Sequence, residues 1–560
     1  MSESFDLLIR GGTIFDGSGA PGRAGDIGIS GGRVAALGTV RGSAARTIDA
    51  SGCAVAPGFV DIHTHYDAQL FWDRMLSISP WHGVTSVVIG NCGFGIAPTR
   101  PQHRDLILRT LESVEGMSLD ALRAGVGSDW PFETFPEFLD ALDERGTAIH
   151  VAALVGHTPV RLYAMGEDAT EREATPGELA QMQAIVRGAL AAGAIGFATS
   201  RAPTHVGYAG KPVPSRAASF AEVQALAGCL AEFDHGVLQA TVGRDLFIPQ
   251  LAEISQSTGK TMSWTALLQG IAGPDAHRQM LALNEKVQAQ GIDVVPQVSC
   301  RPLVLEFQFA APFPFESLSV FKPVSQADRE GKKRVYADPA WRAQFRARAS
   351  EATLTRNWDA IVISDCPGRP DLAEKSIAAV AAERGVDPID LMLDLALASD
   401  LEARFRIPIA NTDDAEVAEL LRHPGTVLGL SDAGAHASQL CDACAPTHLL
   451  AHWVRELSVL TLEEGVRRLT SATADHFGLR DRGRLAVGRP ADAVIFDPDT
   501  VGCGPLRRVR DFPAGADRLV SDAIGIRAVV VEGTVIREEG RDAVDPDGPL
   551  PGHVLRGGKS

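Results

Sequence analysis

The chain has 560 residues, of which 45% are hydrophobic and 22% charged, a balance typical of a globular protein with a substantial core. Its formal net charge of -17 argues against nucleic acid or an anionic membrane surface as a partner. The first ten residues contain no basic segment followed by an apolar one, and no run approaches 18 apolar residues, so we expect a cytoplasmic protein.

The first 56 residues predict short β-strands separated by glycine turns. Pairs such as Gly11-Gly12 lie between runs rich in β-branched and aliphatic residues, which is a hairpin pattern. Residues 481–560 repeat this pattern, for example in the run 526–531 and the Glu532-Gly533 turn. We therefore predict one small β-sandwich built from both chain termini, with residues 1–56 and 481–560 as its two parts.

The middle of the chain, residues 57–480, alternates apolar runs with longer helical patterns. Runs such as 85–90 and 426–430 predict buried strands, and segments such as 176–192 predict the helices between them. Strands that alternate with helices predict parallel βα units, and about eight of these predict an α/β fold of the distorted TIM-type (β/α)8 barrel class. In such barrels the chemistry lies at the carboxyl ends of the strands.

The segment from about 303 to 350 is rich in aromatic residues and too long for a plain loop after a barrel strand. We interpret it as an insertion that covers the mouth of the pocket and receives an apolar acyl or aromatic group. A packing arm or a subunit contact is the alternative interpretation.

The strongest candidate for a site is Asp61-Ile62-His63-Thr64-His65, which follows the apolar stretch 54–60. Alternate side chains share one face of a strand, so His63 and His65 point the same way. Two imidazoles at a strand end form half of a metal site, and imidazole nitrogen suits zinc. The alternative is a pair of structural histidines.

The eight cysteines do not have the spacing of a disulfide framework, and most of them are expected to be small buried residues. Cys441 and Cys444 form a lone C-x-x-C, which makes a zinc knuckle improbable because no second pair lies nearby. Cys92 is separated from the others by its Gly-rich segment, Gly90-Asn91-Cys92-Gly93-Phe94.

Motifs along nearly the whole chain, in the expected order, resemble the amidohydrolase superfamily. The superfamily motifs are residues 8–17, the Pro57–His65 strand and Gly429-Leu430-Ser431-Asp432. Within the superfamily, three further segments look like the N-acyl-D-amino-acid deacylase (D-aminoacylase) branch: residues 90–94, 154–157 and 485–493. The resemblance implies a zinc-dependent hydrolase with a distorted barrel and a β-sandwich formed from both ends of the chain.

The same resemblance implies roles for four residues. His63 and His65 would be metal ligands from the first strand, and Asp432 would be the carboxylate of the last strand. Cys92 would be a thiolate ligand where relatives use a carboxylated lysine. A metal activates water and polarises the scissile carbonyl, while Asp432 accepts the proton of the water and passes it to the leaving nitrogen. The alternatives are a buried thiol for Cys92 and a helix cap for Asp432.

The second metal site of the family is expected to lack two ligands in this chain. Where the branch shows Ala-Thr-His, this chain has Ala240-Thr241-Val242, and where it shows Ile-Ser-His, this chain has Met262-Ser263-Trp264. Val242 and Trp264 cannot bind zinc. Three outcomes stay open. The first is an enzyme with one zinc ion per chain, bound by His63, His65 and Asp432, possibly with Cys92. The others are recruitment of His205 or His436 as a substitute ligand, and a barrel that binds a ligand without hydrolysing it.

We predict an amide hydrolase that acts on a C–N bond, other than a peptide bond, of an N-acyl amino acid or a similar small acid. The alternatives are another amide or cyclic-amide hydrolase of the superfamily and a noncatalytic binding barrel. The expected partner is a small-molecule substrate, and a homo-oligomer stays open. Arginine is the natural bidentate partner of a substrate carboxylate. The candidate substrate-binding residues are His157, Arg201, Arg216, Arg244, Arg301 and Lys375, for each of which a structural histidine or surface ion pair is the alternative.

Overall fold

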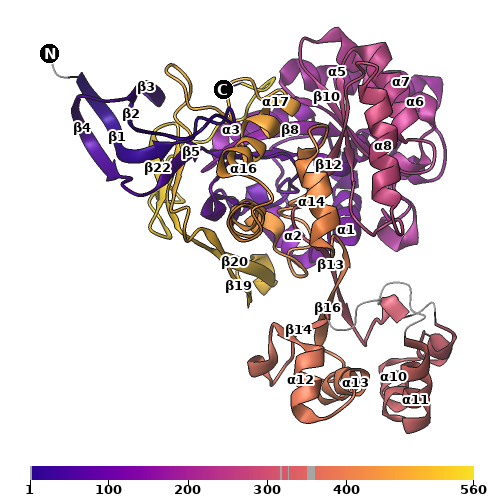
Figure 1. Cartoon of the computed structure of the whole chain (residues 1–560). Helices are drawn as coiled ribbons and strands as arrows, with labels where there is room; N and C mark the ends of the chain where they lie inside the picture. The colour runs from indigo at the N-terminus through magenta and orange to yellow at the C-terminus, as the bar shows by residue number, and fades with distance from the viewer. Residues whose placement is uncertain (1–2, 316–317, 326, 350–359, 560) are drawn as a thin grey trace. The chain divides into compact units, whose positions relative to one another are not determined.

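The computed structural model describes residues 3–315, 318–325, 327–349 and 360–559, which divide into two compact units (Figure 1). Unit 1 comprises Met1–Leu267, His277–Arg301 and Ala418–Ser560, and unit 2 comprises Leu268–Ala276 and Pro302–Val417. Unit 2 therefore continues well beyond the insertion expected at about 303–350.

Unit 1 contains eight parallel strands in the order β17-β12-β11-β10-β9-β8-β7-β6. The two outermost strands of this order are joined by backbone bonds, because the His65 N–H donates to the Ala433 carbonyl at 2.7 Å and the Asp432 N–H donates to the His63 carbonyl at 3.1 Å. The TIM-type barrel is thus confirmed. The strands are β6 (Phe59–Asp61), β7 (Val84–Ile89), β8 (His150–Gly156), β9 (Gly196–Ser200), β10 (Val237–Thr241), β11 (Thr261–Thr265), β12 (Val294–Val298) and β17 (Val427–Leu428).

Helices that follow the strands surround the barrel, as α5 to α8 do around β10 and β12 in Figure 1. The helix expected at 176–192 is α5, Pro176–Ala192, where Thr175 and Glu178 form a capping box and Gly193 ends the helix in the left-handed region. The others are α1 (Arg104–Glu115), α2 (Leu119–Val126), α3 (Phe135–Arg145), α4 (His157–Met165), α6 (Phe220–Gly228), α7 (Ile248–Thr258), α8 (Ala276–Gln288), α14 (Asp414–Arg422), α15 (Ala445–His448), α16 (Leu462–Leu469) and α17 (Ser471–His476).

The barrel interior has an apolar part and a polar part. Buried aliphatic side chains from several strands pack in one cluster that includes Val60, Val88 and Leu154. Polar side chains take inward positions nearer the carboxyl ends of the middle strands, where the Gln297 amide donates to the Ser263 hydroxyl at 3.0 Å. This buried polar part forms the floor of the site described below.

Both termini contribute to one nine-stranded sheet, in agreement with the predicted pairing of the chain ends. The junction is β5 (Ala54–Pro57), which pairs with β1 on one side and antiparallel with β18 on the other. The remaining bounds are β1 (Glu3–Ile14), β2 (Arg23–Ser30), β3 (Arg33–Gly38), β4 (Gly42–Asp49), β18 (Ala493–Phe496), β21 (Ile526–Val531), β22 (Thr534–Glu538) and β23 (Arg541–Asp542), beside a separate hairpin of β19 (Gly502–Val509) and β20 (Arg518–Ile524).

Unit 2 has a small antiparallel sheet and a hydrophobic core of its own. Phe307, Phe309, Phe321 and Tyr336, which were expected to receive an acyl group, are buried within this core, so they stabilise unit 2 itself. Its elements are β13 (Leu303–Gln308), α9 (Lys322–Ser325), α10 (Arg329–Ala337), α11 (Pro339–Arg348), β14 (Val362–Asp365), β15 (Lys375–Ser376), α12 (Ile377–Arg384), α13 (Pro388–Ala398) and β16 (Arg404–Ala410). Within the described part of the chain, no helix is both long and apolar enough to cross a membrane.

Candidate metal centre

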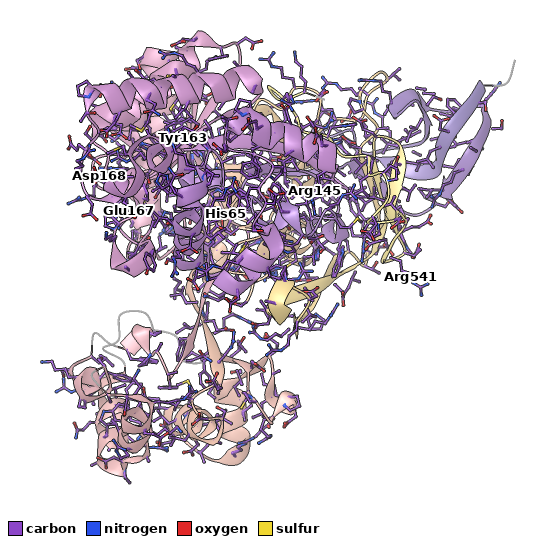
Figure 2. The ribbon with its side chains drawn as sticks, turned by 180° about the vertical axis from the view of Figure 1, so that it is seen from behind. His65, Arg145, Tyr163, Glu167, Asp168 and Arg541 are labelled. Carbon is purple, nitrogen blue, oxygen red and sulfur yellow. The ribbon has the colours of Figure 1, made fainter. Side chains whose placement is uncertain are left out.

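Four side chains meet where the first and last barrel strands come together. His63 and His65 follow β6, Cys92 lies in the turn after β7, and Asp432 follows β17; His65 is labelled in Figure 2. The Nε2 atom of His63 lies 3.4 Å from Cys92 Sγ and 3.4 Å from Asp432 Oδ1. The Nε2 atom of His65 lies 3.8 Å from the same Asp432 oxygen. The structure thus brings all four predicted residues together.

The spacing of these atoms fits a zinc ion. Ligand atoms that surround zinc tetrahedrally at about 2.0 to 2.3 Å stand roughly 3.3 to 3.8 Å from one another. The side chains of His63, His65 and Cys92 each offer a ligand atom within 4.8 Å of the other two, and no other group of three or more such residues occurs among the described residues.

The second nitrogen of each imidazole faces an oxygen atom. His63 Nδ1 lies 2.8 Å from Gln297 Oε1, and His65 Nδ1 lies 3.3 Å from Glu115 Oε1. A proton on Nδ1 leaves the lone pair of Nε2 directed at the other ligands, which is the usual arrangement of metal-binding histidines. The donor set and its surroundings therefore suit a divalent cation.

The position of the Cys92 thiol depends on the two glycines near it, Gly90 and Gly93. Its backbone lies in the left-handed region with φ of 57°, and its N–H donates to Gln239 Oε1 at 2.7 Å. A Cβ atom on Gly90 would lie 2.1 Å from the Leu154 carbonyl oxygen, and one on Gly93 would lie 2.7 Å from the Thr199 Cα atom. Only glycine fits at these two positions, so the Gly-rich segment fixes the thiol against the barrel.

The charges of the four groups are mutually dependent. Burial opposes ionisation of the Cys92 thiol, but His63 and His65 lower its pKa to about 6. Burial also opposes ionisation of Asp432, while His65 and His63 hold the pKa of that carboxyl well below its usual value. The cluster thus combines two groups that favour the anionic form with two imidazoles, a set that a cation can bind.

No sequence pattern points to Glu115 and Gln297, which face the two imidazoles. Glu115 is the last residue of α1 and is only 2% exposed, and Gln297 is fully buried on β12. Neither lies in a recognisable motif. An isolated acidic residue at a helix end is ordinary on a surface, so only its burial distinguishes Glu115.

The barrel strands β10 and β11 each end at a threonine. Trp264 is fully buried and points away from the cluster, because its indole N–H donates to Asn284 on α8 at 2.9 Å. The next residue, Thr265, donates to the Thr241 hydroxyl at 3.2 Å across β11 and β10. Val242 follows directly after β10. The two strands therefore end in threonines, and neither Val242 nor Trp264, which occupy the positions of the family's second-metal imidazoles, offers a ligand.

The two suggested substitute ligands lie near the cluster. His205 Nδ1 lies 2.6 Å from the Ser200 hydroxyl. Burial, His65 and His436 lower the pKa of His205 to about 4. The backbone N–H of His436 donates to the carbonyl of Glu115. Neither His205 nor His436 belongs to a group of three potential ligands within the residues that the structure describes.

Three of the candidate substrate-binding residues already have partners inside unit 1. His157 is fully buried, with Nδ1 2.8 Å from the Thr199 hydroxyl and Nε2 2.9 Å from Glu222. Arg201 binds Asp245 through two nitrogens at 2.9 and 3.0 Å. Arg301 donates to Asp442 at 2.6 Å.

The other candidates differ in exposure. Arg244 is exposed in the turn after β10, and Lys375 is exposed on β15 of unit 2. Arg216 is partly buried, donates to the His205 carbonyl at 2.9 Å and leaves its Nε atom buried without a hydrogen-bond partner. No ion pair of Arg216 occurs in the described ranges of the chain.

Comparisons with known proteins agree with this geometry. Residues 46–537 match the model of a family described as the amidohydrolase family. The chain is 30% identical to a D-aminoacylase of Alcaligenes xylosoxydans xylosoxydans over 96% of both chains, and 30% identical to an N-acyl-D-glutamate deacylase of the same organism over 99% of this chain and 97% of that one. It also resembles the crystal structure of N-acyl-D-glutamate deacylase from Bordetella bronchiseptica complexed with zinc and a phosphonate inhibitor, with 28% identity, a TM-score of 0.66 and coverage of 99% and 100%.

Proposed function

The chain belongs to the amidohydrolase family, and from this premise we propose that it hydrolyses the amide bond of an N-acyl amino acid with the help of a bound metal. The observation that carries the proposal is the convergence of His63, His65, Cys92 and Asp432 at the carboxyl ends of the barrel strands, with Glu115 and Gln297 behind the imidazoles. D-Aminoacylase and two acidic N-acyl-D-amino-acid deacylases are similar to this chain over nearly its whole length, which supports the same class of substrate.

Each residue of the centre has a separate task in this proposal. His63, His65 and Cys92 would hold a zinc ion, and Gln297 and Glu115 orient the two imidazoles. When bound, the metal supplies a Lewis acid for the scissile carbonyl and strengthens water as a nucleophile. The Asp432 carboxylate accepts the proton of the attacking water and returns it to the leaving nitrogen. Its side chain is 26% exposed, so it can meet water and substrate.

We further propose one zinc ion per chain. Trp264 points at Asn284 and cannot contribute a ligand to a second site, and the neighbouring strand ends carry Thr241 and Thr265. One similar structure is a D-aminoacylase described by one-metal activation and second-metal attenuation of a binuclear centre, with 28% identity and a TM-score of 0.66. A single metal is therefore compatible with this chemistry.

Arg216 is the arginine that we propose for the substrate carboxylate. The guanidinium groups of Arg201 and Arg301 are already paired with Asp245 and Asp442. Arg216, by contrast, contacts the His205 carbonyl and has a buried, unpartnered Nε atom. A buried guanidinium nitrogen without an acceptor is costly, and a bidentate carboxylate removes that cost.

The test is metal content together with hydrolysis. The purified full-length protein, prepared without chelators, and its H63A/H65A variant are analysed for zinc and incubated with N-acetyl-D-amino acids and N-acetyl-L-amino acids. We expect about one equivalent of zinc in the wild type, none in the variant, and release of free amino acid by the wild type alone. A wild-type protein that holds its zinc and releases no amino acid from either series would overturn the proposed function.

A further inference from the structure

Three hydroxyl side chains lie side by side at the carboxyl ends of neighbouring barrel strands. Thr241 is the register partner of Ser200 on β9 and of Thr265 on β11. Register partners on parallel strands present their side chains on the same face of the sheet. Trp264 points to α8, so Thr265, the next residue, and its register partners face the interior of the barrel. We name Ser200, Thr241 and Thr265 the hydroxyl row.

A chain of hydrogen bonds with a fixed direction ends at Thr241. The Cys92 N–H, which can only donate, binds Gln239 Oε1 at 2.7 Å and thereby fixes the orientation of the Gln239 amide. The Gln239 Nε2 atom donates to the Thr265 hydroxyl at 3.4 Å, and that hydroxyl donates to the Thr241 hydroxyl at 3.2 Å. Gln239 and Thr265 are buried, so bulk water does not compete for these bonds.

The proton of the Thr241 hydroxyl is not used by another residue. The Thr241 oxygen accepts from Thr265, but the hydroxyl donates to no acceptor within the residues that the structure describes. Thr241 is partly exposed, whereas Thr265 is buried. Successive hydrogen bonds that point the same way polarise one another, so the last hydroxyl of the chain is a good donor for a bound molecule.

The hydroxyl row lies across the barrel from the metal centre. The four residues of the centre follow β6, β7 and β17, which are neighbours because β17 and β6 close the barrel. The row is carried by β9, β10 and β11, on the opposite side of the closed ring. A substrate whose scissile carbonyl meets the metal can direct its other polar group towards this row. In an N-acyl amino acid, that group is the carboxylate.

The row is also joined to the arginine proposed for the carboxylate. The Ser200 hydroxyl lies 2.6 Å from His205 Nδ1, and the His205 carbonyl accepts from Arg216 at 2.9 Å. A strand end and the segment after β9 thus bring Thr241 and Arg216 to the same side of the barrel. A carboxylate has about four lone-pair sites, and a guanidinium uses two of them, so a hydroxyl donor can occupy a third.

We propose that the Thr241 hydroxyl donates a hydrogen bond to the substrate carboxylate and so favours N-acyl amino acids over uncharged amides. The role of Thr241 rests on the proposed function, because it concerns a group of the proposed substrate. The carboxylate does not react, so the hydroxyl binds it equally in the ground state and the transition state. Loss of the hydroxyl should therefore raise KM and leave kcat nearly unchanged.

The experiment compares T241V with T241S in the zinc-loaded full-length protein. Valine keeps the shape of threonine but cannot donate, whereas serine retains the hydroxyl. With the N-acetyl amino acid that the wild type hydrolyses best, we expect T241V to raise KM about 10- to 100-fold and T241S to change it by less than about threefold. T241A takes the place of T241V if that variant does not fold. A KM of T241V within about threefold of the wild type would overturn the proposal.

The matched control is T261V. Thr261 begins β11 at the opposite end of the barrel, where its hydroxyl donates to Asp293. The variant removes a threonine hydrogen bond without touching the hydroxyl row, so KM should stay unchanged. An equal rise of KM in T261V and T241V would assign the effect to a general loss of barrel structure and overturn the role of Thr241.

An analogue without the carboxylate identifies the substrate group that Thr241 contacts. The N-acetyl derivative of the corresponding amine is measured as a competing inhibitor, because its Ki does not require turnover. The Ki should be the same for the wild type and T241V. A rise of Ki in T241V as large as the rise of KM would overturn the proposal, since the hydroxyl would then bind another part of the substrate.

Binding and hydrolysis by the wild type separate failure of the proposed function from failure of the role of Thr241. A zinc-loaded wild type that neither binds nor hydrolyses an N-acyl amino acid would remove both. Binding without hydrolysis would remove the proposed function alone, and calorimetric Kd values of the wild type and T241V would then test Thr241. Hydrolysis with an unchanged KM in T241V would remove only the role of Thr241.

Discussion

Substitution of Asp432 by asparagine separates metal binding from proton transfer. Asparagine has the same shape, so the contacts of 3.4 and 3.8 Å to the two imidazoles can persist, but it cannot accept a proton at neutral pH. General-base catalysis contributes about 100- to 10,000-fold in rate, which corresponds to about 3 to 5 kcal/mol of barrier. We therefore expect kcat of D432N to fall by at least about 100-fold, with KM changed far less.

The metal should stay in this variant, because His63, His65 and Cys92 still offer three ligands. The assay is release of free amino acid from an N-acetyl amino acid, measured alongside zinc content by elemental analysis. A matched control is D245N, which removes a carboxylate that pairs with Arg201 on the same end of the barrel but outside the cluster. If D432N retains zinc and keeps kcat within about threefold of the wild type, the assignment of proton transfer to Asp432 is wrong.

Three further predictions follow from buried contacts. Burial opposes ionisation of Glu222, but His157 and Arg161 lower its pKa to about 2. The ionised Glu222 carboxylate therefore stabilises the fold at any pH above its unfolded pKa of about 4.5, and this stabilisation is lost as the pH falls from about 4.5 towards 2. The variant E222Q should unfold about 3 kcal/mol more easily in urea at pH 7 and lose less stability at pH 3 than the wild type; equal acid sensitivity would contradict this. The variant R216A should raise KM for an N-acyl amino acid about 10- to 100-fold, whereas the control R244A, which changes an exposed arginine, should leave KM unchanged. Equal effects of the two variants would refute the proposed role of Arg216 in binding the substrate carboxylate. The variant W264H should still bind one zinc ion and lower the stability by about 3 kcal/mol, whereas a gain of a second ion would show that position 264 can face the cluster.

Of the metal centre, the sequence alone predicts only the two residues that follow the regular spacing of a β-strand. His63 and His65 are two residues apart at the end of a strand, so strand geometry alone places both on one face. Asp432 and Cys92 were inferred from the resemblance to a family, and the structure brings both to the same point. The roles of the four residues in catalysis stay predictions until the variants are measured.

What the sequence could not predict depends on contacts between distant segments. Glu115 meets His65 only because α1 ends next to His65 in the folded chain, and no local pattern encodes that placement. The orientation of Trp264 was also hidden, since a one-residue difference in register decides whether position 264 or 265 faces the interior. Unit 2 extends to Val417 because its sheet needs β16, a strand far from the aromatic segment that revealed the insertion.

The site forms only when the first and last barrel strands meet, so it depends on the order in which the protein folds. The backbone bonds that join these strands involve His63, His65, Asp432 and Ala433. The hydroxyl of Ser431 donates to the carbonyl of His63 across a separation of 368 residues. Contacts of such long sequence separation form late, because the intervening chain must first be ordered. A nascent or truncated chain that stops before β17 would hold the two histidines and the cysteine but no carboxylate, so hydrolysis would be the last property that this polypeptide acquires.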